Sequence, residues 1–372
     1  MKWDDFLKRR TTRKDYKKTF LMFMATVVVL TLIFTSDFSK IITNIVDTGF
    51  NVIFPYENLK NNSINNLTNG NIFGNSATNS SSNTVLKTDL PQDVILLLAN
   101  AEKKYANSSN DGIIREVDYS TQNATSEFNG IFIRNTTQNH TINIDDYLNK
   151  KVYATINKNE PAVLIYHTHS SETYELLDRG FYTFERSSLS TNTDENMIKI
   201  GEEICKVLEE KGFKTIHDTT VYDEQYSGAY ERARENISKI LKQYPSIQIV
   251  LDIHRDSIYL KDGTRIKPTT IINDKKVSQI SVVTGCEDGS VTDFPNWEKN
   301  LSFALKLQQQ LVTDNPKIAR PLLFCSRKYN MDLIPCALTI EIGTDANTLV
   351  ESIYSARIFA DSLSKLLEEY VK

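Results

Sequence analysis

The chain has 372 residues, which is long enough for more than one domain and a full hydrophobic core. Hydrophobic residues make up 40% of it and charged residues 24%, and the net charge of -4 shows no basic excess of the kind that nucleic-acid-binding proteins carry. The four cysteines have neither CxxC nor zinc-finger spacing, which excludes a zinc finger. Such scattered cysteines are typical of small buried residues, and a disulfide stays open for a chain outside the cytoplasm.

The N-terminus pairs a basic segment with an uncharged one. Residues 1–18 hold eight Lys or Arg against three Asp, and residues 19–36 hold no charge. This pattern predicts a single transmembrane helix that acts as a signal-anchor. A cleaved signal peptide is less favoured, because the apolar stretch is long and no A-x-A site follows it. The positive-inside rule then predicts a cell-membrane protein with a cytoplasmic N-terminus and an extracytoplasmic catalytic domain.

Residues 37–88 are expected to form a juxtamembrane segment followed by a linker. From residue 60 to 88 the sequence is dominated by Asn, Ser, Thr and Gly, which cannot bury enough apolar surface to fold. This part therefore predicts a flexible tether. Residues 89–160 predict a helix followed by short strands, which we interpret as a small lead-in subdomain.

Strands and helices alternate from residue 161 to residue 372. The pattern predicts strands at 161–166, 213–218, 246–256 and 336–343, helices at 195–212, 224–245, 295–312 and 347–371, and β-structure with turns at 258–284. Alternation of this kind indicates an α/β domain with a mostly parallel central sheet flanked by helices.

Residues that suit metal chemistry follow three of these strands. They are His167, His169 and Glu172 after the first strand, His254 in the third, and Glu341 in the last. Because sites in open α/β sheets form outside the carboxyl ends of the strands, these side chains are expected to converge. Three protein ligands drawn from imidazole and carboxylate groups, with one open position, are what a catalytic zinc requires.

The roles of the neighbouring carboxylates follow from that interpretation. Asp252 or Asp256 could fix the tautomer of His254, although the same residues would also suit ordinary surface ion pairs. Glu341 interrupts an apolar strand, where a carboxylate is costly unless it is paired or useful. It could act as general base towards a zinc-bound water, or it could form a structural salt bridge.

Several long motifs in this order resemble the stage II sporulation protein P family of endospore-forming bacteria. They are VLIYHTHSSETY (163–174), HDTTVYDEQYSGAYERAR (217–234), IVLDIHRD (249–256), PNWEKNLSFALKLQ (295–308), YNMDLIPCALTIEIGTDANTLVES (329–352) and the N-terminal anchor. The resemblance implies a catalytic domain similar to zinc-dependent N-acetylmuramoyl-L-alanine amidases. It also implies cleavage of peptidoglycan at the glycan–peptide amide and at peptide cross-links, a role in engulfment at the sporulation septum, and stage II sporulation proteins D and M as partners.

The resemblance also implies roles for individual residues. His169 corresponds to the first amidase histidine, because it lies three residues after the last strand residue, Tyr166. His254 corresponds to the second histidine, and Glu341 to the late catalytic glutamate. The resemblance therefore implies zinc ligands at His169 and His254 and a catalytic base at Glu341.

The identity of the glutamate ligand is left open by the same comparison. In the wider amidases this ligand stands at the start of the next helix, where the chain offers Asp194 and Glu195 out of clean register. Glu172 is preferred, since it shares one loop with His169. His167 is either a further ligand or a residue that supports one.

Three other functions compete with a cell-wall amidase. A zinc peptidase acting on a protein would activate water in the same way. A non-catalytic wall-binding scaffold would be expected to lack some of the ligands. A glycosidase that uses two carboxylates is disfavoured by the paired histidines.

Overall fold

The computed structural model describes residues 90–372. The predicted cytoplasmic tail (1–18), transmembrane segment (19–36) and nearly all of the predicted linker region (37–88) lie outside the described residues. The helices are α3 (Gln92–Lys104), α4 (Ile144–Leu148), α5 (Met197–Glu210), α6 (Ala229–Gln243), α7 (Trp297–Asp314) and α8 (Leu349–Glu368). The strands are β1 (Gly112–Val117), β2 (Ser126–Phe128), β3 (Ile131–Asn135), β4 (Pro161–Tyr166), β5 (Phe181–Tyr182), β6 (Lys214–His217), β7 (Ile249–Asp256), β8 (Arg265–Ile272), β9 (Lys275–Ser278), β10 (Ile280–Gly285), β11 (Leu322–Cys325) and β12 (Ala337–Thr344).

The central sheet has eight strands in the order β2-β3-β11-β10-β12-β7-β4-β6. A second sheet has the order β5-β1-β8-β9. Both sheets mix parallel and antiparallel pairs: β10 runs antiparallel to β12, β2 to β3, β5 to β1, and β9 to β8. The class is α/β, but the prediction of a mostly parallel sheet was wrong.

The reversal at β12 has a local cause. Parallel neighbours need a crossover of a dozen or more residues, usually a helix, between their strands. The helix α7 provides such a crossover from β10 to β11, and these two strands are parallel. Between the end of β11 at Cys325 and the start of β12 at Ala337 there is no helix, so the chain turns back and β12 runs the other way.

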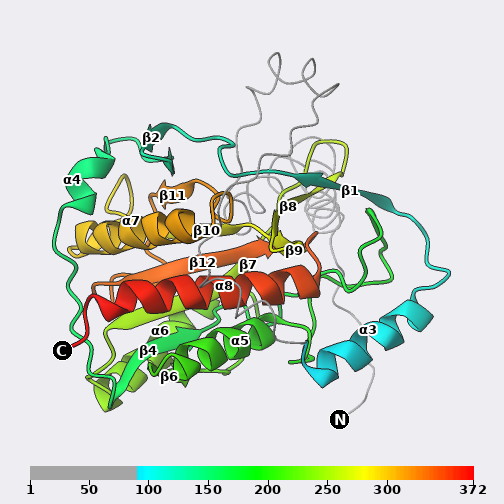
Figure 1. The fold of residues 1–372 in the computed structure, drawn as a ribbon, viewed down its shortest axis with the longest axis horizontal. Helices are drawn as coiled ribbons and strands as arrows, with labels where there is room; N and C mark the ends of the chain where they lie inside the picture. The colour runs from blue at the N-terminus through cyan, green and yellow to red at the C-terminus, as the bar shows by residue number, and fades with distance from the viewer. Residues whose placement is uncertain (1–89) are drawn as a thin grey trace, which may run out of the picture. The chain divides into compact units, whose positions relative to one another are not determined.

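Helices cover the two faces of the central sheet in separate layers. On one face, α5, α7 and α8 lie side by side (Figure 1), and their apolar residues form the larger core cluster with Ile165, Leu251 and Ile340. On the other face, α6 contributes Ala233 and Ile237 to a second cluster. The helix α6 matches its sequence pattern, since it buries one apolar stripe against the sheet, whereas α5 is buried around most of its surface.

Local signals in the sequence fix where two of these helices begin. Asn196 caps α5 by accepting a hydrogen bond from the Ile198 amide at 3.0 Å. Thr348 and Glu351 form a reciprocal capping box at the start of α8. Each cap satisfies amide groups that the first helical turn leaves without partners.

The membrane prediction is corrected by the described residues. Among residues 90–372, no helix combines the length and the apolar character that a bilayer crossing requires. The predicted transmembrane helix and cell-membrane localisation therefore find no support, and we do not retain them.

The region from 90 to 160 contributes strands to both sheets. β3 pairs with β11 in the central sheet, and β1 pairs with β8 in the smaller one. The predicted domain boundary at residue 160 stays a prediction. All four cysteines are buried and unpaired.

Candidate active site

Three neighbouring strands bring the sequence-predicted residues to one edge of the central sheet. β4, β7 and β12 are parallel neighbours, so their carboxyl ends lie together. Tyr166 is in register with Asp252, and His254 with Glu341. His169 follows β4 by three residues and therefore lies at the same edge.

The two candidate ligand histidines face one another. The ring centroids of His169 and His254 are 5.5 Å apart in an edge-on arrangement. Tyr226 stacks on His169 at 4.5 Å, and Tyr230 stacks parallel to His254 at 6.5 Å. The Nδ1 atom of His169 is shielded from solvent and has no hydrogen-bond partner. A buried nitrogen in this state is costly for the fold, which fits a site that a ligand completes.

Glu172 points into the same site. One of its oxygens lies 3.6 Å from Nδ1 of His254 and accepts a hydrogen bond of 3.3 Å from the Arg255 amide. Burial alone would raise the pKa of Glu172, but the Arg255 guanidinium and His254 outweigh it and lower the pKa to about 2. Glu172 is therefore ionised at neutral pH, as a metal ligand must be.

Glu195, the alternative ligand, is already paired. Its Oε2 atom lies 3.0 Å from the Arg186 guanidinium, and its Oε1 atom accepts a hydrogen bond of 2.5 Å from Ser190. Asp194 is partly exposed on the same loop. Of the three carboxylates considered as the third ligand, Glu172 is the one that lies beside His254.

Asp252 holds the loop that carries His169. It accepts hydrogen bonds from the Thr168 amide (2.9 Å) and hydroxyl (2.6 Å). Its Oδ1 atom also lies 2.8 Å from Nε2 of His254, but this contact lacks hydrogen-bond geometry, so it is an ion-pair distance only. Burial would lower the pKa of His254, yet the charge of Asp252 outweighs it and raises this pKa. The charge of Asp252 thus favours the protonated form of His254.

His167 lies on the opposite face of the sheet. His167 directly follows β4 and lies against Gly201 of α5, which covers the face opposite His254. Its Nδ1 atom lies 3.0 Å from the Ile253 carbonyl oxygen, and its Nε2 atom lies 2.9 Å from Nε2 of His217. Gly201 of α5 leaves room for this pair, since a Cβ there would come within 2.6 Å of His167. The structure therefore separates His167 from the two facing histidines.

Glu341 lies in β12 directly beside His254. The side chain is partly exposed, but its Oε2 atom is shielded and has no hydrogen-bond partner. Burial, and after it the charge of Asp256, raises the pKa of Glu341 to about 8. Asp256 itself is paired with Arg320 at 2.6 Å rather than with His254. A carboxyl group with a pKa near neutrality can both take up and release a proton.

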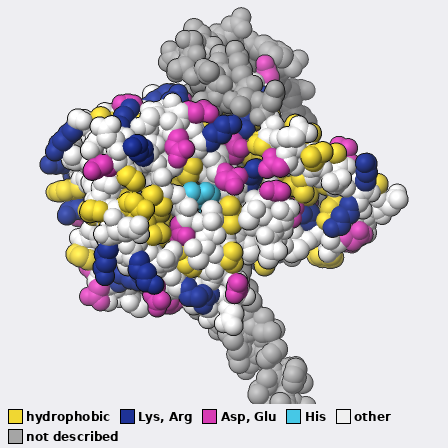
Figure 2. Space-filling view, turned by 90° about the horizontal axis from the view of Figure 1, so that it is seen from below, with side chains coloured by type: hydrophobic (Ala, Val, Ile, Leu, Met, Phe, Trp, Pro, Cys, Tyr) yellow, Lys and Arg dark blue, Asp and Glu magenta, His cyan; other side chains and the backbone are white. Residues whose placement is uncertain are grey.

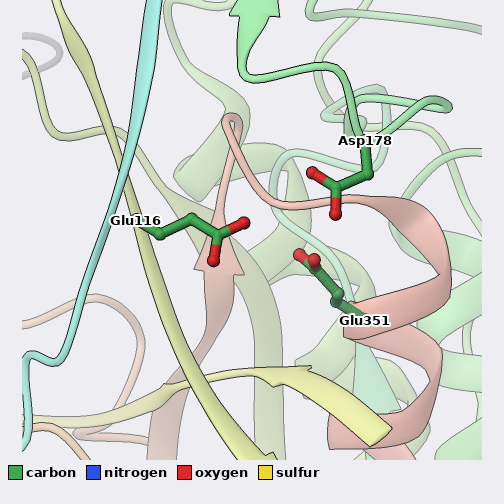
Figure 3. Close-up of side chains that lie close together, drawn as sticks. All are labelled: Glu116, Asp178 and Glu351. Atoms are coloured by element: carbon green, nitrogen blue, oxygen red, sulfur yellow. The ribbon is translucent and has the colours of Figure 1, made fainter.

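The side chains at the sheet edge are of the types that zinc binds. Their ligand atoms, however, do not lie close enough together to hold an ion without a change of side-chain conformation. Among residues 90–372, the one group of three candidate ligand atoms within 4.8 Å of each other is Glu116, Asp178 and Glu351 (Figure 3). The ammonium group of Lys267 already pairs with two of these carboxylates, at 2.7 Å from Asp178 and 2.8 Å from Glu351. His169, Glu172 and His254 would have to rotate to close around an ion.

Sequence reasoning missed several residues that shape the site. Asp223 accepts hydrogen bonds from Ser170 and from the amide and hydroxyl of Ser171, which ties down the loop after β4. Tyr226 and Tyr230 cover the histidine rings. Both tyrosines lie in the motif at 217–234. Residue spacing alone did not show that this motif contributes to the site. Figure 2 shows histidine at the surface of one face, bordered by acidic and hydrophobic side chains.

Comparison with known proteins gives matches in sequence and in structure. The model of the family described as stage II sporulation protein P matches residues 80–364. Stage II sporulation protein P of Bacillus subtilis (strain 168) is 26% identical over 216 residues, which cover 55% of this chain. The match spans about half the length of that relative (50%).

Two solved structures also show a likeness. N-acetylmuramoyl-L-alanine amidase AmiC2 of Nostoc punctiforme is 14% identical, with a TM-score of 0.34 over 58% of this chain and 98% of that one. The CwlD amidase from Clostridioides difficile, solved in complex with the GerS lipoprotein, is 15% identical, with a TM-score of 0.35 over 56% and 98%. TM-scores this low carry no argument about function. The family match covers most of the chain and confirms the sequence-based prediction: the chain belongs to the stage II sporulation protein P family.

Proposed function

We propose that the chain is a zinc-dependent peptidoglycan hydrolase, an N-acetylmuramoyl-L-alanine amidase that also cleaves peptide cross-links. The proposal extends to septal wall degradation during engulfment, with stage II sporulation proteins D and M as partners. The observation that carries it is the convergence of His169, Glu172 and His254 beside Glu341 at one sheet edge. Family membership supports the sporulation role.

The three ligands and the base divide the chemistry between them. His169, Glu172 and His254 would hold the zinc, and Asp252 would orient His254. When bound, zinc would lower the pKa of a water molecule and polarise the amide carbonyl. Glu341 would take a proton from the attacking water and return it to the leaving amine nitrogen.

The raised pKa of Glu341 suits this double task. A carboxyl group with its ordinary pKa would be a weaker base towards the attacking water. Burial and Asp256 raise the pKa of Glu341 to about 8, so its carboxylate takes up a proton more readily. Tyr226 and Tyr230 line the histidines and limit the access of bulk water to them.

One experiment tests the proposal directly. Purified full-length chain is incubated with sacculi, with and without a chelator, and the products are identified by mass spectrometry. An amidase releases stem peptides with a free N-terminal alanine, and His254→Ala abolishes their release. His140→Asn is the matched control. The His140 ring contacts the Glu287 carbonyl oxygen, and both residues are distant in sequence from the strand ends that carry the candidate ligands.

Other outcomes point to the competing functions. Activity that survives both the chelator and His254→Ala would rule out the metal mechanism. Cleavage of proteins but not of sacculi would indicate a zinc peptidase. Binding to sacculi without any product would indicate a scaffold.

A further inference from the structure

A row of aromatic rings leads away from the candidate ligands across one face of the central sheet. Tyr226 stacks on His169, and the His169 ring meets Tyr230 edge-on at 5.7 Å between centroids. Tyr230 in turn stacks on Tyr329, with the ring centroids 5.1 Å apart and the ring planes inclined by 28°. All three tyrosines keep surface exposed to solvent. Tyr329 belongs to the loop between β11 and β12, so the row extends beyond the residues that the proposed chemistry uses.

Tyr329 has a backbone conformation that a bulky side chain rarely adopts. Its φ angle is 43° and that of Asn330 is 58°, both in the left-handed region. Contacts with α6 hold the loop in this state. The Asn330 side chain donates a hydrogen bond of 2.9 Å to the Tyr230 carbonyl oxygen, and the Arg234 guanidinium donates two to Asp332, of 2.8 and 2.7 Å. Backbone strain that the surroundings impose in this way is concentrated at functional sites.

Tyr329 lies over the same face of the sheet as Glu341. It packs against Val283 of β10 and Leu323 of β11, in a small cluster apart from the main core. Ser281 is in register with Glu341, and Val283, two residues further along β10, therefore points to the same face. Two residues along a strand and one strand across place the Cα atoms of Val283 and Glu341 about 8 Å apart. A ligand group next to an amide at Glu341 can therefore reach Tyr329.

The surface that Tyr230 and Tyr329 present is aromatic and uncharged. Each ring offers an apolar face and a hydroxyl group at its tip. The sugar part of the substrate matches this surface, because a pyranose ring combines a face of C–H groups with a rim of hydroxyl and amide groups. The stem peptide carries carboxylates, which favour cationic partners such as the exposed Arg327 in the same loop.

We propose that Tyr329, stacked on Tyr230, forms a subsite for the sugar ring that carries the scissile amide. The inference rests on the proposed function, and it names the part of the substrate that this surface binds. The sugar lies against the Tyr329 ring while the amide attached to it lies at Glu341. Tyr329 therefore determines specificity by contact with the substrate and takes no part in the proton transfer.

The test measures the binding of three soluble ligands to the full-length chain carrying Glu341→Gln, which leaves the ligands intact. They are the disaccharide of N-acetylglucosamine and N-acetylmuramic acid with its lactyl carboxyl capped as the methylamide, the free stem peptide, and the same disaccharide joined to that peptide. Calorimetry gives the Kd of each ligand. Adding Tyr329→Asn is expected to weaken both sugar-containing ligands about tenfold, as the loss of one aromatic contact would, and to leave the free peptide unchanged.

The choice of variants separates the subsite from damage to the fold. Asn tolerates a left-handed backbone, so Tyr329→Asn removes the ring without adding strain. Tyr329→Leu keeps apolar packing against Val283 and Leu323 and should weaken sugar binding to the same extent. Tyr329→Phe keeps the aromatic face and should bind nearly as tightly as the parent. Tyr153→Ala is the matched control, because it removes a tyrosine that is 50% exposed and lies outside the row, and it should change none of the three Kd values.

Kinetics and binding together distinguish failure of the subsite from failure of the proposed function. With otherwise wild-type chain, Tyr329→Asn should raise KM for the joined ligand about tenfold and leave kcat nearly unchanged. Disaccharide binding that depends on Tyr329 supports the subsite even if the wild type cleaves nothing, and the amidase proposal alone then fails.

Three results would overturn the subsite, whether or not the wild type cleaves. The capped disaccharide does not bind the parent, or it binds the parent, Tyr329→Asn and Tyr329→Leu equally. A loss of binding confined to the free stem peptide would also overturn it, and would assign this surface to the peptide part of the substrate.

Discussion

Replacing Glu341 by Gln is expected to abolish activity and to stabilise the fold at alkaline pH. The deprotonated form of Glu341 is disfavoured in the folded chain, because burial and Asp256 raise its pKa from 4.5 to about 8. At about 1.4 kcal/mol for each pKa unit, this corresponds to at most roughly 5 kcal/mol. The side chain is partly exposed, so solvent screening reduces the expected gain on substitution to about 1–3 kcal/mol.

The sign of the pH dependence follows from proton binding. Between pH 4.5 and about 8, the folded chain keeps a proton on Glu341 that the unfolded chain has released. The free energy of unfolding of the wild type must therefore fall as the pH rises through this window. Glu341→Gln carries no titratable group there, so the variant should lack this fall, and the two proteins should be equally stable below pH 4.5.

The assay is chemical unfolding of the metal-free chain at a series of pH values, together with product release from sacculi. We expect the loss of the general base to lower kcat by about 100- to 10,000-fold. Wild type and variant with parallel stability curves from pH 4 to 9 would show that the folded chain does not raise the pKa of Glu341. Near-normal kcat in the folded variant would refute its role as base.

Three further substitutions test the surroundings of the site. Glu172→Gln is expected to weaken zinc binding more than about 100-fold in a titration against a chelating indicator, while Glu195→Gln leaves it nearly unchanged; equal losses would contradict our choice of ligand. Gly201→Ala places a Cβ 2.6 Å from Nε2 of His167 and should lower the free energy of unfolding, measured in urea, by about 1–3 kcal/mol. An unchanged midpoint of the urea transition would argue against the tight contact. Asp252→Asn should destabilise the chain at neutral pH, and the difference should vanish well below pH 3.8, because His254 and hydrogen bonds hold the pKa of Asp252 below that value despite burial. A difference that does not shrink as the pH falls below 3.8 in acid unfolding would refute this assignment.

The long amphipathic elements could be predicted from the sequence. The periodic apolar positions of α6 mark a buried stripe, and Gly212 and Thr348 mark the end of α5 and the start of α8. Apolar runs such as 161–166 likewise predicted buried strands, and β4 occupies those residues. Local patterns suffice where one face of an element is buried and a cap stops it.

Strand direction could not be predicted in the same way. β11 is only four residues long and lacks a distinguishing pattern, so the reversal between Cys325 and Ala337 had no local signal. Strand pairing depends on contacts between segments that are far apart in the sequence. A single sequence does not show which of these segments pair. The mixed character of the central sheet follows from these pairings alone.

The end of β4 explains why the spacing of His167 and His169 could not show which face of the sheet each side chain reaches. His167 and His169 are two residues apart, which would place both on one face if the strand continued. The strand ends at Tyr166, and the following loop is bound to Asp252 and Asp223, so the parity rule stops there. The partner of His167 is His217, from a strand whose register only the folded sheet defines.

Lys267, which pairs with the acidic cluster of Glu116, Asp178 and Glu351, makes a chelator experiment easier to interpret. Lys267 is a cation that belongs to the chain itself, so no chelator can extract it and no added metal is needed to neutralise Glu351 and Asp178. Its side chain is 1% exposed, which also keeps competing ions from replacing it. Within residues 90–372, any loss of activity that a chelator causes and added zinc reverses can therefore be assigned to the histidine site rather than to this built-in counter-ion.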